Sequence, residues 1–312
     1  RDPHLGKVMR YQLRYIRKQC FVHCLRDSSG TAVEIPNPEV RPSSEPLNYT
    51  SPYLNESLPP PLIFSRIYDC NMSDMHNWPS IDQLIGPERR NQDDYWVRAV
   101  FATTITGSTS INGRSQNLGN QLDTELLLGL REWAEVILVG SGTVRAEDYA
   151  GVQPTDKKPN PAPLAVMTSS LDFDYDSRFF HDYHVPHLFM VPESSLQDPT
   201  NYTKVQKLQA FGEVISTGSG TVRECITTLV NRGFARISCE GGPSILGGLI
   251  SANAVDQFYL TIDPTLTNAV ESPITRCTSD TTVKHKMRLE SSMHCPDSTL
   301  FLRYGHPRVN SM

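Results

Sequence analysis

The stretch Val136-Ile137-Leu138-Val139-Gly140-Ser141-Gly142-Thr143 joins a short apolar run to a glycine-rich turn. An apolar run of this length that ends at a glycine is typical of a strand buried on both faces. Strands of that kind occur in parallel sheets, because the connecting helices cover both faces of the sheet. The stretch therefore predicts an α/β fold class.

The same pattern continues along the chain on either side of this stretch. Further apolar runs predict strands at 96–102, 164–167, 188–191, 235–239 and 258–262. Apolar side chains at helical spacing predict helices over 122–133 and 222–230. Two segments near 286–294 and 298–304 flank a Pro296-Asp297 turn and predict an antiparallel C-terminal edge hairpin. Strands that alternate with helices predict a mainly parallel central sheet with helices on both faces.

Composition and charge exclude several classes of protein. The 312 residues carry a formal net charge of −5 with both signs interspersed, so the chain lacks the basic face of a nucleic-acid-binding protein. No apolar run approaches the roughly 20 residues that span a bilayer, so we expect no membrane segment. The seven cysteines follow no regular spacing, which predicts reduced thiols in a cytoplasmic protein and no metal site.

The chain divides into two parts by composition. Residues 36–61 are rich in proline and include Pro59-Pro60-Pro61, and each proline removes a backbone donor that a helix or central strand needs. We therefore interpret residues 1–60 as a poorly ordered N-terminal extension or a segment added for expression. Residues 61–312 are expected to form one domain.

A second glycine-rich turn, Glu240-Gly241-Gly242-Pro243-Ser244, follows the predicted strand at 235–239. Neither turn is a Walker loop, and Arg145 stands where the third glycine of the dinucleotide-binding fingerprint would be. Glycines at the carboxyl end of a strand still let backbone amides approach a phosphate, and the helix that follows adds its positive end. Each turn alone is more simply a tight turn, but the two together favour a site for a dinucleotide pyrophosphate.

The run from Ile137 to Tyr149, followed later by Cys239-Glu240-Gly241-Gly242-Pro243-Ser244, resembles the pyrimidine reductases of riboflavin biosynthesis, the RibD C-terminal domain family. The resemblance covers roughly residues 95 to 304 and is strongest to single-domain members. It implies a dihydrofolate-reductase-like fold, NADPH as the cofactor, a small-molecule substrate and a homodimer. The His-x-Glu and Pro-Cys-x-x-Cys motifs of the deaminase zinc site do not occur in the sequence, which excludes deaminase activity.

The resemblance assigns the cofactor site to three turns. The first turn is expected to contact the pyrophosphate and the nicotinamide ribose through Gly140, Ser141, Gly142 and Thr143. The second would line the pyrophosphate from the other side through Gly241, Gly242, Pro243 and Ser244. The third matches a hydroxyl-rich turn for the adenosine 2′-phosphate and comprises Thr168, Ser169 and Ser170. An ordinary polar turn explains this third stretch about equally well, and no arginine adjoins it in the sequence to select NADPH over NADH.

Two carboxylates are predicted to act on the substrate. By resemblance, Asp123 holds the heterocycle and helps supply the proton that accompanies hydride transfer. An acidic residue in the first turn of a helix also has a purely structural use, because it interacts favourably with the helix dipole. Glu240 matches a substrate-contacting glutamate, and at the end of a buried strand its charge would be unfavourable if unpaired. Further substrate contacts are expected from Thr104, Thr106 and Glu147.

Several positions depart from the family pattern. Thr104-Ile105-Thr106-Gly107 stands where the family has Ser-Leu-Asp-Gly, Val100 replaces a lysine, and no arginine aligns with the one that grips the substrate's phosphate. We predict an NADPH-dependent reductase resembling 5-amino-6-(5-phosphoribosylamino)uracil reductase, acting on a ribosylamine or imine carbon. Two alternatives stay open. One is a dihydrofolate (dihydropterin) reductase, and the other is a nucleotide-cofactor-binding protein without turnover.

Overall fold

The computed structural model describes residues 78–87, 95–277 and 281–307. Contacts along the chain divide it into two units, Arg1–Arg66 and Ile67–Met312. All described residues belong to the second unit. The expected N-terminal extension at 1–60 lies outside the described residues, so that boundary stays a prediction.

A mixed nine-stranded sheet organises this unit, with the order β5-β4-β3-β2-β6-β1-β7-β9-β8. The strands are β1 Trp96–Thr104, β2 Val136–Gly140, β3 Leu164–Met167, β4 His187–Val191, β5 Gly212–Ser216, β6 Arg236–Cys239, β7 Gln257–Asp263, β8 Arg288–His294 and β9 Leu300–Gly305. The first seven strands pair in parallel, and β9 runs antiparallel to both β7 and β8. The predicted mainly parallel sheet and its antiparallel C-terminal hairpin are therefore confirmed.

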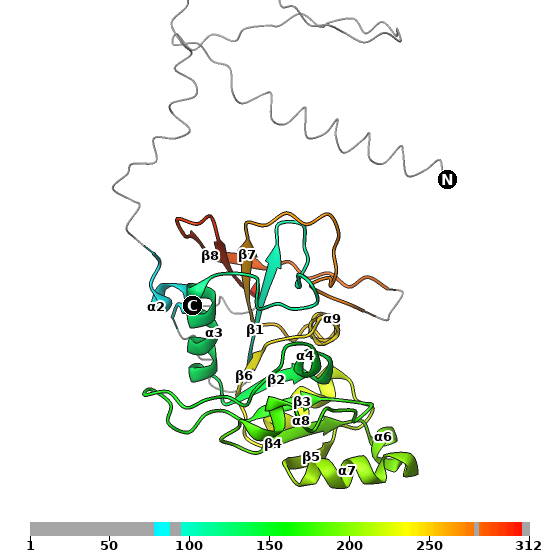
Figure 1. The fold of residues 1–312 in the computed structure, drawn as a ribbon. Helices are drawn as coiled ribbons and strands as arrows, with labels where there is room; N and C mark the ends of the chain where they lie inside the picture. The colour runs from blue at the N-terminus through cyan, green and yellow to red at the C-terminus, as the bar shows by residue number, and fades with distance from the viewer. Residues whose placement is uncertain (1–77, 88–94, 278–280, 308–312) are drawn as a thin grey trace, which may run out of the picture. The chain divides into compact units, whose positions relative to one another are not determined.

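Helices cover both faces of the sheet, as the sequence predicted (Figure 1). They are α2 Ile81–Ile85, α3 Gln121–Trp133, α4 Ser141–Ala146, α5 Arg178–His181, α6 Glu193–Gln197, α7 Tyr202–Gln209, α8 Val222–Asn231 and α9 Pro243–Ser251. Alternate residues of β1 point to opposite faces, so Phe101 packs with α8 and α9 while Val100 packs with α2 and α3. None of the helices in the described part is long and apolar enough to cross a bilayer.

The adjacent strands β2 and β6 place the two glycine-rich turns. These strands are parallel neighbours, with Ile137 paired to Ser238 and Leu138 to Cys239. Parallel strands end at the same edge of a sheet, which is where α/β proteins bind their ligands. The turns that follow β2 and β6 therefore emerge side by side although about a hundred residues separate them in the sequence.

Candidate active site

The two glycine-rich turns contact each other directly. The amide of Gly140 donates a hydrogen bond of 2.9 Å to the carbonyl oxygen of Gly241. Gly241 has a φ of +106°, a backbone conformation that favours glycine. A Cβ placed on Gly242 would lie 2.8 Å from Oγ1 of Thr143, so the second turn approaches the start of α4 too closely for a side chain. The predicted association of the two turns is therefore present in the structure.

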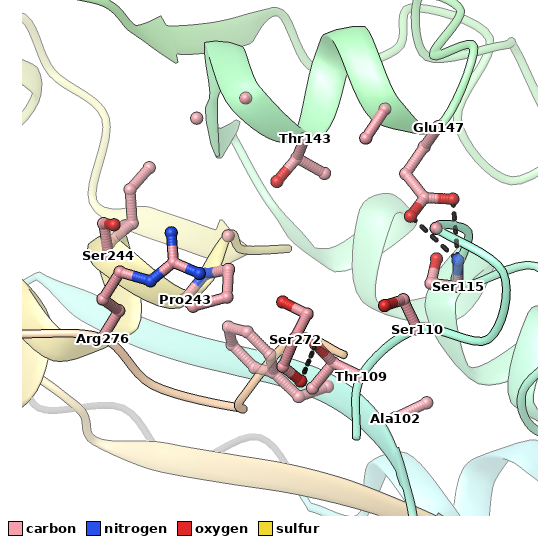
Figure 2. A pocket seen from close by; sticks show the side chains of 17 residues that line it. Ala102, Thr109, Ser110, Ser115, Thr143, Glu147, Pro243, Ser244, Ser272 and Arg276 are labelled. Carbon is pink, nitrogen blue, oxygen red and sulfur yellow. Dashed lines mark hydrogen bonds between the residues drawn. The ribbon is translucent and has the colours of Figure 1, made fainter. Parts of the chain in front are cut away.

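A cavity of about 380 Å³ opens beside these turns (Figure 2). Its volume falls within the usual range for small-molecule sites. It is lined by Phe101, Ala102, Thr109, Ser110, Gly113, Ser115, Gly140, Gly142, Thr143, Ala146, Glu147, Gly242, Pro243, Ser244, Ile245, Ser272 and Arg276. Two of these carry charge. Figure 2 shows Arg276 with Ser244 at one end of the cavity and Glu147 with Ser115 at the other.

Two carboxylates fasten the segment 108–115, which forms one wall of the cavity. Both carboxylate oxygens of Glu147 accept hydrogen bonds from the amide of Ser115, at 2.9 and 3.1 Å. Glu271 accepts from the amides of Asn112 and Gly113, both at 3.0 Å. These amide bonds lower the pKa of Glu271, because they stabilise its charged form. The two carboxylates thus hold the wall mainly through its backbone amides. The hydroxyl of Ser110 also donates to Glu271 at 3.4 Å.

Some of the predicted cofactor and substrate residues line the cavity, and others lie elsewhere in the structure. Seven of them line the cavity: Gly140, Gly142, Thr143, Glu147, Gly242, Pro243 and Ser244. Ser141 and Gly241 belong to the same two turns but are not among the lining residues. Thr104 and Thr106 stand at the end of β1, where their hydroxyls bond each other at 2.9 Å. Thr106 also bonds the hydroxyl of Thr267, so this pair joins two loops.

Glu240 directly follows β6, with its side chain turned to an arginine. Nε and Nη2 of Arg131 each donate to one of its carboxylate oxygens at 2.7 Å. The hydroxyl of Tyr149 also donates to Glu240. The Glu240 side chain is 4% exposed and does not line the cavity. Arg131 therefore compensates the charge of Glu240, for which the sequence indicated no partner. The predicted contact of Glu240 with substrate stays a prediction.

Asp123 lies in the first turn of α3, within hydrogen-bond reach of β7. Its carboxylate accepts from the hydroxyl of Thr261 at 2.5 Å. Burial raises the pKa of Asp123 and the nearby charge of Asp263 adds to the rise, while the Thr261 bond opposes it. Asp123 is not among the residues that line the cavity, so its role in the chemistry stays a prediction.

The turn of Thr168, Ser169 and Ser170 follows β3, and the structure places one cation on it and a second cation on the segment just after it. Lys204 of α7 donates to the carbonyl of Ser170 at 3.0 Å and to Oδ1 of Asp172 at 2.6 Å. Arg145 of α4 donates to the carbonyl of Asp172 at 2.8 Å. Asp172 lies two residues beyond this turn, so the fold brings a guanidinium near it although no arginine adjoins it in the sequence. The assignment of this turn to the cofactor stays a prediction.

The cavity also contains residues that the sequence reasoning missed. The segment Thr109, Ser110 and Ser115 follows the carboxyl end of β1, and that position alone could have indicated it. Arg276 lies in the long connection between β7 and β8, where no pattern points to it. It supplies a cation at the cavity that the alignment to the family lacked.

Comparison with known proteins agrees with this geometry. The model of the RibD C-terminal domain family matches residues 95–301. A curated relative, the 2,5-diamino-6-ribosylamino-4(3H)-pyrimidinone 5′-phosphate reductase of Archaeoglobus fulgidus, is 27% identical over 209 residues, which is 62% of this chain and 91% of the relative. A solved pyrimidine reductase-like protein of Corynebacterium diphtheriae superposes with a TM-score of 0.61 at 29% identity, over 68% of this chain and 91% of that one.

A third similarity concerns the fold alone. RibD of Acinetobacter baumannii is 13% identical with a TM-score of 0.55, and the match covers 69% of this chain and 58% of that one. The expected dihydrofolate-reductase-like fold of the RibD C-terminal domain is thereby confirmed.

Proposed function

Because this chain belongs to the RibD C-terminal domain family, we propose that it is an NADPH-dependent reductase that delivers hydride to the ribosylamine or imine carbon of a phosphorylated pyrimidine. The observation that carries the proposal is the meeting of two glycine-rich turns at one cavity. The Archaeoglobus fulgidus relative supports the substrate class, since its name describes reduction of such a compound.

The residues at the cavity suit a dinucleotide. Gly142 lies in α4, and a Cβ added to it would have no protein atom within 4 Å. Its absent side chain thus leaves free space in the cavity wall. Around it stand the hydroxyls of Thr143 and Ser244, which donate hydrogen bonds to phosphate or ribose oxygens. We assign the first turn, the second turn and the Thr168–Ser170 turn to NADPH, which supplies the hydride when bound.

The substrate then occupies the end of the cavity near the segment 108–115. Glu147 faces this end and accepts N–H bonds, so its carboxylate is suited to orient a pyrimidine. Ser110 and Ser115 add hydroxyls that can donate to the substrate's oxygens or accept from its N–H groups. The proposed substrate residues also include two carboxylates that do not line the cavity, Asp123 and Glu240. Thr104 and Thr106, at the end of β1, complete the set.

Filling the free space at Gly142 tests the cofactor assignment. In Gly142→Leu the added Cβ has open space around it, and leucine favours a helix more than glycine does. We therefore expect an unchanged or raised melting temperature together with a rise of about tenfold or more in the Kd for NADPH, measured by cofactor fluorescence. Ser194→Leu on the exposed surface of α6 is the matched control and should leave the Kd unchanged. Equal NADPH affinity in Gly142→Leu would remove the first turn from the cofactor site.

Turnover tests the reaction. NADPH oxidation is followed by absorbance with 2,5-diamino-6-ribosylamino-4(3H)-pyrimidinone 5′-phosphate and, separately, with dihydrofolate. We expect oxidation with the pyrimidine alone. Oxidation with dihydrofolate alone would replace the proposal by a dihydropterin reductase. NADPH binding without oxidation by either would favour a cofactor-binding protein without turnover.

A further inference from the structure

Arg276 is fixed by its backbone against the first turn of α9. Its amide donates a hydrogen bond of 2.9 Å to the carbonyl oxygen of Pro243, the first residue of the helix. One turn further on, a Cβ placed on Gly247 would lie 2.2 Å from the carbonyl oxygen of Arg276. The glycine therefore permits a close approach of the two main chains. The position of Arg276 is set by atoms that a change of its side chain would leave intact.

The side chain of Arg276, an exposed residue, lines the cavity and has no partner among the described residues. Among the described residues, no carboxylate lies within 4 Å of its guanidinium and no hydrogen bond is made by it. By contrast, Arg131 pairs with Glu240 and Arg232 with Glu213. The other charged lining residue, Glu147, stands at the far end of the cavity and already accepts from Ser115. An anion entering the cavity therefore meets a guanidinium that is not engaged elsewhere.

The start of α9 places further hydrogen-bond donors beside Arg276. The helix begins at Pro243, which has no amide hydrogen, and the amide of Ile245 donates to the carbonyl of Gly242 at 3.0 Å. Gly242 offers no side chain as a cap for the amide of Ser244. Ser244 at the second position is exposed and lines the cavity next to Arg276. A nine-residue helix whose amino end is free of a side-chain cap favours a negative charge there. A guanidinium, a hydroxyl and a helix amino end thus converge on one part of the cavity.

We infer that Arg276 binds a phosphate group in this cavity, from either the cofactor or the substrate. The planar fork of a guanidinium donates two parallel hydrogen bonds to phosphate oxygens, which a lysine does not reproduce. Arg276 would then perform the task of the family's phosphate-binding arginine from a different segment of the chain. The identity of the ligand rests on the proposed function, whereas the phosphate chemistry rests on the cavity itself.

Binding of simple anions tests the inference without turnover. Calorimetry compares inorganic phosphate and pyrophosphate on the wild type, Arg276→Gln and Arg276→Lys. We expect the glutamine variant to lose about tenfold or more in affinity for at least one anion, and the lysine variant to fall between. Arg232→Gln is the control, since that arginine pairs with Glu213 on the exposed surface. Equal affinity in all four proteins, or no binding by the wild type, would overturn the inference. Matching circular dichroism and melting curves establish that the variants are folded.

Two further measurements on Arg276→Gln, the Kd for NADPH and the KM for the pyrimidine, identify the source of the phosphate. If it belongs to the cofactor, Arg276→Gln raises the Kd for NADPH and leaves the KM for the pyrimidine unchanged. If it belongs to the substrate, the variant raises the KM for the 5′-phosphate about tenfold but changes neither kcat nor the reaction of the dephosphorylated substrate. Either result supports the inference, whereas no change in any of these constants contradicts it.

These measurements also separate the inference from the proposed function. Arg276-dependent anion binding in a protein that never oxidises NADPH would refute the proposed function and retain the inference. Full reductase activity in Arg276→Gln with unaltered constants would retain the proposed function and refute the inference.

Discussion

Glu240 shows how a single buried carboxylate can be held in place by its partners. Burial alone would lower the pKa of Arg131, but the charge of Glu240, the interaction with Tyr149 and the hydrogen bonds to both together outweigh burial and raise that pKa above its usual range. Burial, reinforced by the same carboxylate, also raises the pKa of Tyr149, so its hydroxyl stays protonated and donates. Glu240 is thus held between two donors, one from α3 and one from the segment after α4. This triad fixes the residue that precedes Gly241, and through it the second glycine-rich turn.

Removing the arginine from this triad should unfold the protein more easily. Arg131→Met removes one partner of the buried pair with Glu240, which in proteins lowers the free energy of unfolding by about 3 to 5 kcal/mol. Urea denaturation measures this loss. The control is Arg178→Met, which breaks an exposed pair with Asp182 and should change stability little. Similar losses in the two variants would contradict a stabilising triad.

A second substitution shows whether the charge is the cause. In Arg131→Met, the further change Glu240→Leu removes the orphaned carboxylate, so we expect it to restore part of the lost stability. Additive losses in the double variant would mean that packing, and not the buried charge, dominates at this site.

Individual contacts of this kind were the part of the site that the sequence did not reveal. The alternation of apolar runs and glycines located both turns, because local backbone requirements are written in adjacent residues. Arg131 and Glu240 meet across 109 residues, and Arg276 reaches its place through backbone contacts of an irregular segment. No local periodicity encodes such pairs, since they depend on how the strands are ordered.

At the scale of elements, strands and helices with a strong period were predicted and weak ones were not. The predicted strand at 164–167 coincides with β3, and the helix over 122–133 with α3 apart from one residue. The short edge strand β5 and the helices α2 and α7 had no counterpart in the prediction. β5 carries a single buried residue, Ile215, so its sequence shows neither a continuous apolar run nor a clear alternation.

The packing of β4 on α5 predicts a dependence of stability on pH. His187 begins β4, is 1% exposed and stacks on Phe179 of α5 with ring centroids 4.0 Å apart. Burial lowers the pKa of His187, and the hydrogen bond to the carbonyl of Phe179 only partly offsets this. The folded state thus favours the neutral ring. As the pH falls below the unfolded value of about 6.5, the unfolded chain takes up the proton first, so stability is lost.

Comparison of the wild type with His187→Phe isolates this contribution. The free energy of unfolding of the wild type should fall between pH 7 and pH 5 with an added slope of at most about 1.4 kcal/mol per pH unit from this histidine. His187→Phe keeps a stacked ring but cannot titrate, so its slope should be smaller. His181→Phe on α5, where the ring is exposed, is the control and should keep the wild-type slope. Parallel curves for all three proteins would exclude His187 as the source.

The whole unit extends beyond the part that the family model recognises. The match begins at residue 95, yet α2 at Ile81–Ile85 packs on α3 and the C-terminal strands. Leu84 is 4% exposed, and the guanidinium of Arg303 donates to its carbonyl at 2.6 Å. The hydroxyl of Tyr259 donates to the carbonyl of Ile85 at 2.9 Å. The helix therefore covers the same apolar cluster that anchors α3 and its Asp123.

A chain that begins at residue 95 should consequently be less stable than one that begins at residue 67. Loss of α2 exposes the cluster that Leu84 covers and removes the carbonyls that satisfy Arg303, each contributing about 1.5 to 3 kcal/mol. We expect a lower urea midpoint for the shorter chain.

Leu84→Ala in the full chain should lower the free energy of unfolding by about 2 to 5 kcal/mol, whereas Asp82→Ala on the exposed face of α2 should change it little. Because every residue that lines the cavity lies between Phe101 and Arg276, the chain from residue 67 should bind NADPH as the full chain does. Equal midpoints for the two truncated chains would show that the fold is complete without α2.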